Sequence, residues 1–236
     1  NTQRPEWNDA NNALVGNGVS MVTLYYLRRF LQFLEDILKS SADETVHISS
    51  ELYTFYVSIK TTLQNHHDII EKPVSNKERK LIMDKLGIAA SNFRNKVYNN
   101  SFCGDKANLD LSDLRSFCRI TLDFLEHSIV ANERADGLFH AYNLMTVENE
   151  EEVSISYLSE MLEGQVAVLS SDYLSPSKAV KVLDALKSSA LFRPDQYSYI
   201  LYPNKELPGF ISKNEIPQSA IEQSSVLRSM IKEGNT

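Results

Sequence analysis

The chain has 236 residues, of which 42% are hydrophobic and 23% are charged, and its net charge is -7 at pH 7. These values are typical of a globular protein with one large domain or two small ones, and they argue against disorder. The acidic balance disfavours a general nucleic-acid surface, because phosphate binding needs clustered lysine and arginine.

The first predicted helix spans about residues 20–39. Its leucines recur three and four residues apart, which places them on one stripe of a helix. Tyr26, Phe30 and Phe33 widen the apolar face, so we expect this helix to be covered on more than one side.

A second helix is predicted over about residues 48–70. Pro73 is expected to end it, because proline cannot continue a helix. Ser75 and Glu78 fit the capping box, in which both side chains satisfy free backbone N–H groups at a helix start. The third helix is therefore expected to begin there and to continue towards Tyr98.

The fourth helix follows a polar loop at residues 99–108 and is expected to be capped by Asp110 or Ser112. Residues 134–152 form the least regular part of the interior. A fifth helix is predicted over about residues 153–170.

The sixth helix is predicted to start at Ser175 and Pro176, a serine cap with proline in the first turn, and to reach about residue 188. Residues 191–217 indicate an extended or looped segment. A last helix is predicted over about residues 218–232. Seven helices and almost no strand signal predict an all-α fold of antiparallel helical hairpins, with residues 1–236 forming a single helical domain.

The N-terminal segment concentrates the side chains that suit chemistry. Trp7 is the only tryptophan and lies between the carboxylates of Glu6 and Asp9. An indole face is a good platform for a sugar ring, and a nearby carboxylic acid can protonate a departing glycosidic oxygen. Acidic residues before a helix also favour its positive end, so spacing alone leaves a structural role open.

Residues 6–12, Glu-Trp-Asn-Asp-Ala-Asn-Asn, are followed by a glycine and a predicted helix. This run resembles the Asp-Trp-Asn-Asp-(small)-x-Asn segment of cellobiose and chitobiose phosphorylases, inverting glycoside phosphorylases built on an (α/α)6 barrel. The resemblance implies that Asp9 is the general acid and that Trp7 and Asn8 hold the sugar, with Glu6 replacing the family's first Asp. It implies an oligosaccharide substrate and no cofactor, with inorganic phosphate as co-substrate in a phosphorylase.

The catalytic domain of that family is considerably longer than this chain, with six outer and six inner helices. The resemblance therefore implies that residues 1–236 are the C-terminal part of a larger (α/α)6 barrel, part of a toroid-like domain. The remainder of a larger polypeptide, or another copy of the chain, is then an expected partner.

A second candidate segment lies between two predicted helices and contains Arg134, Asp136 and His140. Arg134 and His140 are candidates to hold phosphate or sugar hydroxyls, and Asp136 is a candidate base if the reaction is hydrolysis. The alternative is a loop tied to a helix end by local hydrogen bonds.

Glu163 is the other candidate base and a candidate substrate contact. Gly164 beside it allows something to approach the backbone closely. The alternative is that Gly164 permits tight helix packing while Glu163 lies in solvent. We predict no metal site, because His66 and His67 are adjacent rather than four residues apart on a helix.

The cysteines and the apolar stretches bear on the compartment. Cys103 and Cys118 give neither a disulfide framework nor zinc-ligand spacing, which favours a reducing compartment. The most apolar stretch, residues 19–38, is interrupted by charges, and no basic region followed by an apolar one marks a secretion signal. We expect a cytoplasmic protein with no membrane partner.

Two functions follow as hypotheses. The first is a carbohydrate-active enzyme that cleaves a glycosidic bond by phosphorolysis or hydrolysis. The second is a helical interaction or scaffold module without chemistry. The position of Trp7 separates them, because an open cleft with Asp9 favours sugar chemistry and a tryptophan wedged between helices favours a scaffold.

Overall fold

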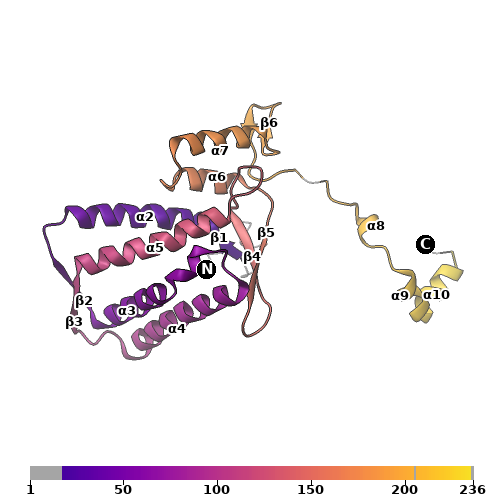
Figure 1. Cartoon of the computed structure of the whole chain (residues 1–236). Helices are drawn as coiled ribbons and strands as arrows, with labels where there is room; N and C mark the ends of the chain where they lie inside the picture. Colours follow the sequence, from indigo (N-terminus) through magenta and orange to yellow (C-terminus); the bar gives the residue numbers. More distant parts are fainter. Residues whose placement is uncertain (1–17, 205, 235–236) are drawn as a thin grey trace. The chain divides into compact units, whose positions relative to one another are not determined.

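The computed structural model describes residues 18–204 and 206–234. The chain divides into two compact units, the first ending at Pro203 and the second starting at Asn204. The first unit is mainly helical, as predicted, but it also contains three small antiparallel sheets (Figure 1). The prediction of an all-α chain is therefore corrected to a mixed fold in which helices predominate.

The four long helices of the first unit are α2 (Met21–Ser40), α3 (Ser50–Asn65), α4 (Asn76–Asn100) and α5 (Leu111–Ala131). A 3-10 helix, η2 (His67–Glu71), follows α3, and two shorter helices come later, α6 (Leu162–Leu169) and α7 (Pro176–Ser188). The strands are β1 (Gly18–Ser20), β2 (Thr45–Ser49), β3 (Lys106–Asp110), β4 (Tyr142–Val147), β5 (Val153–Tyr157), β6 (Phe192–Arg193) and β7 (Ser198–Tyr199).

Serine caps fix the starts of three helices where the sequence predicts them. The Ser20 hydroxyl accepts the N–H of Thr23 at the start of α2. Ser75 and Glu78 form the complete capping box of α4. Ser175 caps α7, whose first residue is proline. Each cap satisfies backbone N–H groups that have no partner within the helix, so local chemistry alone sets these boundaries.

The strands are where the helical prediction is wrong. The predicted fifth helix is strand over its first five residues, β5, and helical only in α6. Val153, Ile155 and Tyr157 alternate with serines, a period of two that suits a strand. The start of the predicted second helix is likewise the end of β2, and the end of the predicted loop at 99–108 is part of β3.

The second unit contains α8 (Phe210–Lys213), α9 (Gln218–Gln223) and α10 (Ser225–Lys232). The predicted last helix is interrupted at Ser224, whose backbone is extended, with φ -108° and ψ 119°. Its hydroxyl accepts the N–H of Leu227 and so starts α10 as a separate helix.

The four long helices pack as two antiparallel pairs, α2 with α5 and α3 with α4 (Figure 1). The α3–α4 pair is a hairpin of consecutive helices, as predicted. The partner of α2 is not the next helix, because the antiparallel β2–β3 pair brings Thr45 opposite Asp110. That pairing holds the end of α2 beside the start of α5.

The largest buried cluster lies where α2, α5, α6 and α7 meet the segment that follows α5. Its fully buried side chains include Tyr25, Ile129, Phe139 and Val168. The Tyr25 ring meets the Phe139 ring edge to face at 6.5 Å, and its hydroxyl donates to the carbonyl of His140 at 2.9 Å. The core therefore fixes the segment that holds the second group of candidate residues.

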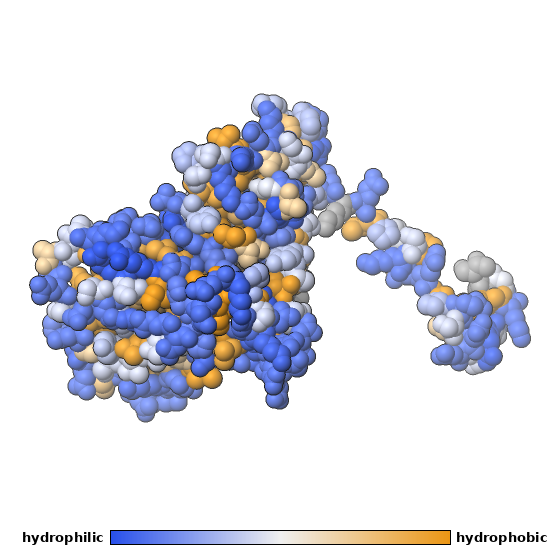
Figure 2. Space-filling view, viewed as in Figure 1, coloured by the Kyte–Doolittle hydropathy of each residue, from blue (hydrophilic) through white to orange (hydrophobic). Residues whose placement is uncertain are grey.

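Charged side chains interrupt the apolar character of the long helices. Arg28 and Glu35 are both buried in α2, which contains most of the predicted apolar stretch. In residues 18–204 and 206–234 no helix has both the length and the apolar content needed to cross a membrane. The face shown in Figure 2 is mostly polar, with apolar patches separated from one another.

Candidate functional site

The four candidates of the N-terminal motif lie outside the described residues: Glu6, Trp7, Asn8 and Asp9. Their roles stay predictions. The described chain begins in β1, which pairs antiparallel with β4 so that Gly18 lies opposite Leu144 and Ser20 opposite Tyr142. β1 is thus hydrogen-bonded to the start of β4, directly after the segment at residues 132–141, which we name the α5–β4 loop.

A tight turn shapes the α5–β4 loop. The N–H of Gly137 donates to the carbonyl of Arg134 at 3.0 Å, and the N–H of Arg134 donates to the carbonyl of Leu138 at 2.8 Å. Gly137 has φ +80°, a left-handed conformation that favours glycine. This turn determines where the neighbouring charged side chains point.

Arg134 and Asp136 bond to each other. The Arg134 guanidinium donates to both carboxylate oxygens of Asp136, at 2.8 to 3.1 Å, and also to Glu160 at 3.2 Å. This pairing lowers the pKa of the Asp136 carboxyl below its usual value. Asp136 also accepts the N–H of Leu138. The two predicted substrate contacts therefore stabilise the turn, as in the structural alternative, and their role in binding stays a prediction.

His140 is a buried imidazole. Its ring stacks on the Tyr157 ring with centroids 4.4 Å apart and an interplanar angle of 16°, and its Nδ1 has no hydrogen-bond partner among the described residues. Burial lowers the pKa of His140, and the nearby Arg134 charge lowers it further. Tyr157 as a whole is 55% exposed. Sequence analysis did not select Tyr157, whose signal is its place at the end of the alternating β5 segment.

The lowered pKa of His140 predicts a pH-dependent stability. The unfolded chain takes up the histidine proton near pH 6.5, whereas the folded chain takes it up only at lower pH. The free energy of unfolding should therefore fall as the pH drops from 7.5 to 5.5, by at most about 1.4 kcal/mol per pH unit for this one proton. Urea denaturation at pH 7.5, 6.5 and 5.5 measures it. His140→Phe should flatten the profile, and exposed His47→Phe should not; an unchanged slope in His140→Phe would assign the effect to other groups.

Glu163 is in the first turn of α6 and accepts a hydrogen bond from the Tyr142 hydroxyl at 2.8 Å. The neighbouring Gly164 meets the backbone of Ala141: a Cβ at position 164 would lie 3.0 Å from three Ala141 atoms. The close approach predicted for this glycine is confirmed, and what approaches is the protein's own loop. Glu163 is therefore placed toward β4 rather than in bulk solvent, and its substrate role stays a prediction.

Gly164→Ala should destabilise the protein by about 1–3 kcal/mol, because the added methyl would lie closer to Ala141 than side chains normally pack and would push the α5–β4 loop away from α6. The gain in helix propensity, about 1 kcal/mol, does not offset a clash of that size. Gly87→Ala is the matched control, since nothing lies within 4 Å of a Cβ there and the same propensity gain should appear alone. Urea midpoints that rise in both variants would contradict the clash.

Gln165 is the buried polar residue whose structural role sequence analysis did not recognise. Its Oε1 accepts the N–H of Phe139 at 2.9 Å, and its Nε2 donates to the carbonyl of Phe139 at 2.7 Å and to that of Met161 at 3.0 Å. Gln165 is fully buried. Phe139 lies opposite Glu133 in an isolated antiparallel bridge, and the Gln165 side chain from α6 is the partner of the Phe139 N–H and carbonyl themselves.

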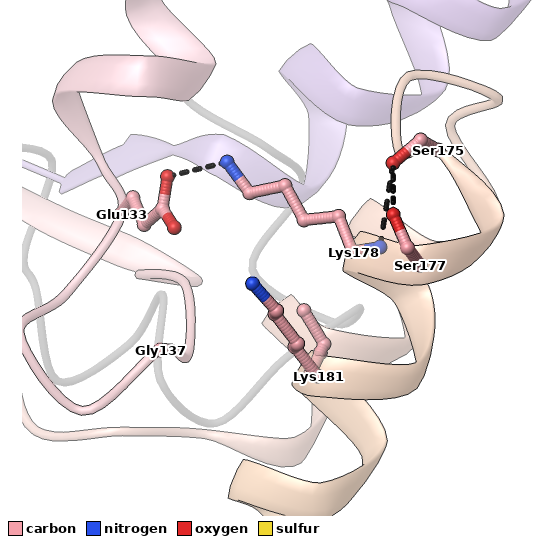
Figure 3. Close-up of a pocket in the computed structure, with 7 residues that line it drawn as sticks. Glu133, Gly137, Ser175, Ser177, Lys178 and Lys181 are labelled. Carbon is pink, nitrogen blue, oxygen red and sulfur yellow. Dashed lines mark hydrogen bonds and ion pairs between the residues drawn. The ribbon is translucent and has the colours of Figure 1, made fainter.

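The α5–β4 loop and the start of α7 line a polar hollow of about 460 Å³, shown in Figure 3. Lys178 crosses it to an ion pair with Glu133 at 2.6 Å, while the ammonium group of Lys181 points into it and forms no ion pair in the described part of the chain. The other lining residues are Gly137, Ser175, Ser177 and Val182. Without an aromatic side chain in its lining, the hollow suits a small anion better than a neutral sugar.

The structure brings Arg134, Asp136 and His140 into one loop and places Glu163 on the helix packed against that loop. Within residues 18–204 and 206–234, no group of three or more metal-ligating side chains could hold a metal ion. Comparison with models of known protein families gave no match, and comparison with curated protein sequences gave none either. The resemblance of residues 6–12 to the phosphorylase segment therefore stays a prediction.

Proposed function

We propose that this chain is a helical portion of a carbohydrate-active enzyme that cleaves a glycosidic bond and is related to the inverting glycoside phosphorylases. The observation that carries the proposal is the motif at residues 6–12, in which the only tryptophan stands two residues before Asp9. Asp9 protonates the departing glycosidic oxygen while Trp7 and Asn8 hold the sugar. In a phosphorylase, inorganic phosphate attacks the anomeric carbon, so no base is required.

The pairing of β1 with β4 supports this assignment. Gly18 is nine residues after Asp9, and a segment of that length reaches at most about 30 Å. Tyr157, on the strand next to β4, is exposed and offers a second stacking surface for a sugar.

The helix pairs support the finer proposal that the chain contributes to an (α/α)6 toroid. Such a toroid is assembled from antiparallel helix pairs, and α2–α5 and α3–α4 are antiparallel pairs of the kind it needs. The β2–β3 sheet connects the two pairs at one end, since β2 joins α2 to α3 and β3 joins α4 to α5. In a hydrolase, Asp136 or Glu163 is the residue we propose as the base that activates water.

Fluorescence of Trp7 tests the sugar site directly, because no other tryptophan contributes to the signal. We expect a saturable change with gluco- or N-acetylglucosamine disaccharides, absent in Trp7→Phe and altered in Asp9→Asn. Asp43→Asn, an exposed loop carboxylate, is the matched control and should behave as wild type. A flat response across the panel would contradict a sugar site in this chain.

Product analysis separates phosphorolysis from hydrolysis. A phosphorylase forms a sugar 1-phosphate only when phosphate is present, and Asp9→Asn should lower that rate by about 10²–10⁴-fold, the usual contribution of a general acid. A hydrolase forms the free sugar without phosphate, and Asp136→Asn or Glu163→Gln should then abolish the reaction. Product formation that Asp9→Asn leaves unchanged would exclude Asp9 as the acid.

A helical interaction module without chemistry is the second candidate. It is favoured by the ion pair of Arg134 with Asp136 and by the Tyr142–Glu163 hydrogen bond, since these polar groups already serve the fold. Acrylamide quenching of Trp7 distinguishes the two candidates. Strong quenching that a disaccharide relieves supports the enzyme, whereas weak quenching that no sugar changes supports the module.

A further inference from the structure

An apolar stripe covers the outward face of α2. It consists of large side chains that are 45%, 56%, 62% and 47% exposed: Tyr26, Phe30, Phe33 and Ile37. We name it the α2 stripe. Its spacings of four, three and four residues are those of the a and d positions in a coiled-coil heptad.

The opposite face of α2 is the one that packs into the protein. Tyr25, Leu31 and Glu35 are buried on that side, and α2 packs there against α5 and α6. Figure 1 shows α2 at the edge of the four long helices. Sequence analysis expects α2 to be covered on more than one side, and within the described residues the α2 stripe is the side that is left exposed. Aromatic side chains concentrated on an exposed stripe are typical of an interaction surface.

The charges beside the α2 stripe indicate what covers it. Arg29 and Asp36 lie seven residues apart on one flank, at equivalent heptad positions, while Leu27 and Leu34 form the other flank. Arg29 is exposed and makes no ion pair with any residue in the described ranges. The Asp36 carboxylate is 60% exposed, with one oxygen 3.2 Å from the Lys39 ammonium. The flank thus presents one accessible charge of each sign.

Arg29 and Asp36 of one copy are complementary in charge to Asp36 and Arg29 of a second copy that is related to it by a two-fold axis. When two α2 helices pair antiparallel, positions of this kind face each other, so that Arg29 of one copy lies opposite Asp36 of the other, twice in the dimer. A parallel pair would instead place the charged flank of one copy beside the leucine flank of the other, so that neither Arg29 nor Asp36 would face an opposite charge. The same antiparallel register places Phe30 opposite Phe33, and Tyr26 opposite Ile37.

We propose that the α2 stripe is a homodimer interface in which two copies of this chain pair through antiparallel α2 helices. The apolar stripe supplies the affinity, and the Arg29–Asp36 pairs set the direction and register. This interface is independent of the sugar chemistry proposed for Asp9, because the dimer forms with or without a substrate.

Sedimentation of the whole chain over a range of concentrations tests the interface. We expect a monomer–dimer equilibrium that Phe33→Glu weakens by at least 100-fold, because the dimer would bury an unpaired charge. Tyr98→Glu, a change of an exposed aromatic residue on α4, should leave the equilibrium unchanged. A chain that is monomeric at every concentration, or a dimer that tolerates Phe33→Glu, would overturn the proposal.

Charge reversal tests the pairing. Arg29→Asp and Asp36→Arg should each weaken the homodimer about tenfold or more, since like charges then meet twice. An equimolar mixture of the two variants should regain dimerisation, because every facing pair is again opposite in sign. A mixture that dimerises no better than either variant alone would contradict the antiparallel pairing.

Cross-linking tests the direction. In a Cys103→Ser background, which removes the exposed thiol, Tyr26→Cys and Ile37→Cys should form a disulfide-linked dimer only when the two variants are mixed. Parallel helices would link each variant to itself, and that result would overturn the proposed geometry.

Discussion

Arg28→Leu is expected to lower the free energy of unfolding by about 2–3 kcal/mol, because it removes a half-buried ion pair and leaves the carbonyl of buried Ser171 without a donor. The Arg28 guanidinium donates twice to Glu126 on α5, at 3.0 and 2.8 Å. It also donates to the carbonyls of Ser171 and Asp172 after α6, at 3.1 and 2.8 Å. One buried side chain therefore connects α2 to α5 and to the turn that follows α6.

The planar guanidinium is what allows this connection. Arg28→Lys keeps the charge but lacks the fork that reaches a carboxylate and two carbonyls together, so it should recover only part of the loss. Urea denaturation at one fixed protein concentration measures both variants. Arg94→Leu, an exposed arginine on α4, is the control and should stay within about 0.5 kcal/mol of wild type. An Arg28→Leu protein as stable as the control would show that the connection contributes nothing.

Gln165→Leu is expected to lower the free energy of unfolding by about 3 kcal/mol, the second large effect. It leaves the N–H and the carbonyl of Phe139 without partners, and Phe139 is fully buried, so water cannot replace either hydrogen bond. Gln165→Glu should be no better at pH 7, because a carboxylate accepts the N–H but has no hydrogen to donate to the carbonyl.

Hydrogen exchange distinguishes this local effect from a general loss of stability. The amide of Phe139 should be protected in the wild type, and in Gln165→Leu it should exchange faster than the amides of α4. Gln64→Leu, an exposed glutamine on α3, should change neither exchange nor the urea midpoint. Equal protection of Phe139 in both variants would show that Gln165 does not hold the loop.

The starts of α2, α4 and α7 were predictable because each depends on side chains within three residues of the boundary. A serine whose hydroxyl accepts a backbone N–H two or three residues later fixes the first residue of a helix. The same local argument missed β5, although its alternation is present in the sequence, because a short alternating run is easily absorbed into a neighbouring helical pattern.

The sequence predicted that Arg134, Asp136 and His140 lie in one polar loop. It did not predict which side chains they contact. A cation, an acid and an imidazole within seven residues predict a candidate binding loop. The residues that contact them come from other segments of the chain. Glu160 reaches Arg134 from the segment after β5, and Tyr157 covers His140 from β5 itself. The paired arrangement that results depends on how β4 and β5 fold together.

The sequence by itself determined the helical majority, the serine-capped boundaries and the motif at residues 6–12, because each is written in neighbouring residues. Only the tertiary structure decided that Arg28 and Gln165 are buried and that Gly164 touches Ala141. The same holds for the α2 stripe, which remains exposed while its opposite face is buried. Periodicity places a residue on a face of a helix, but the partner that covers the face is chosen by packing between segments far apart in the chain.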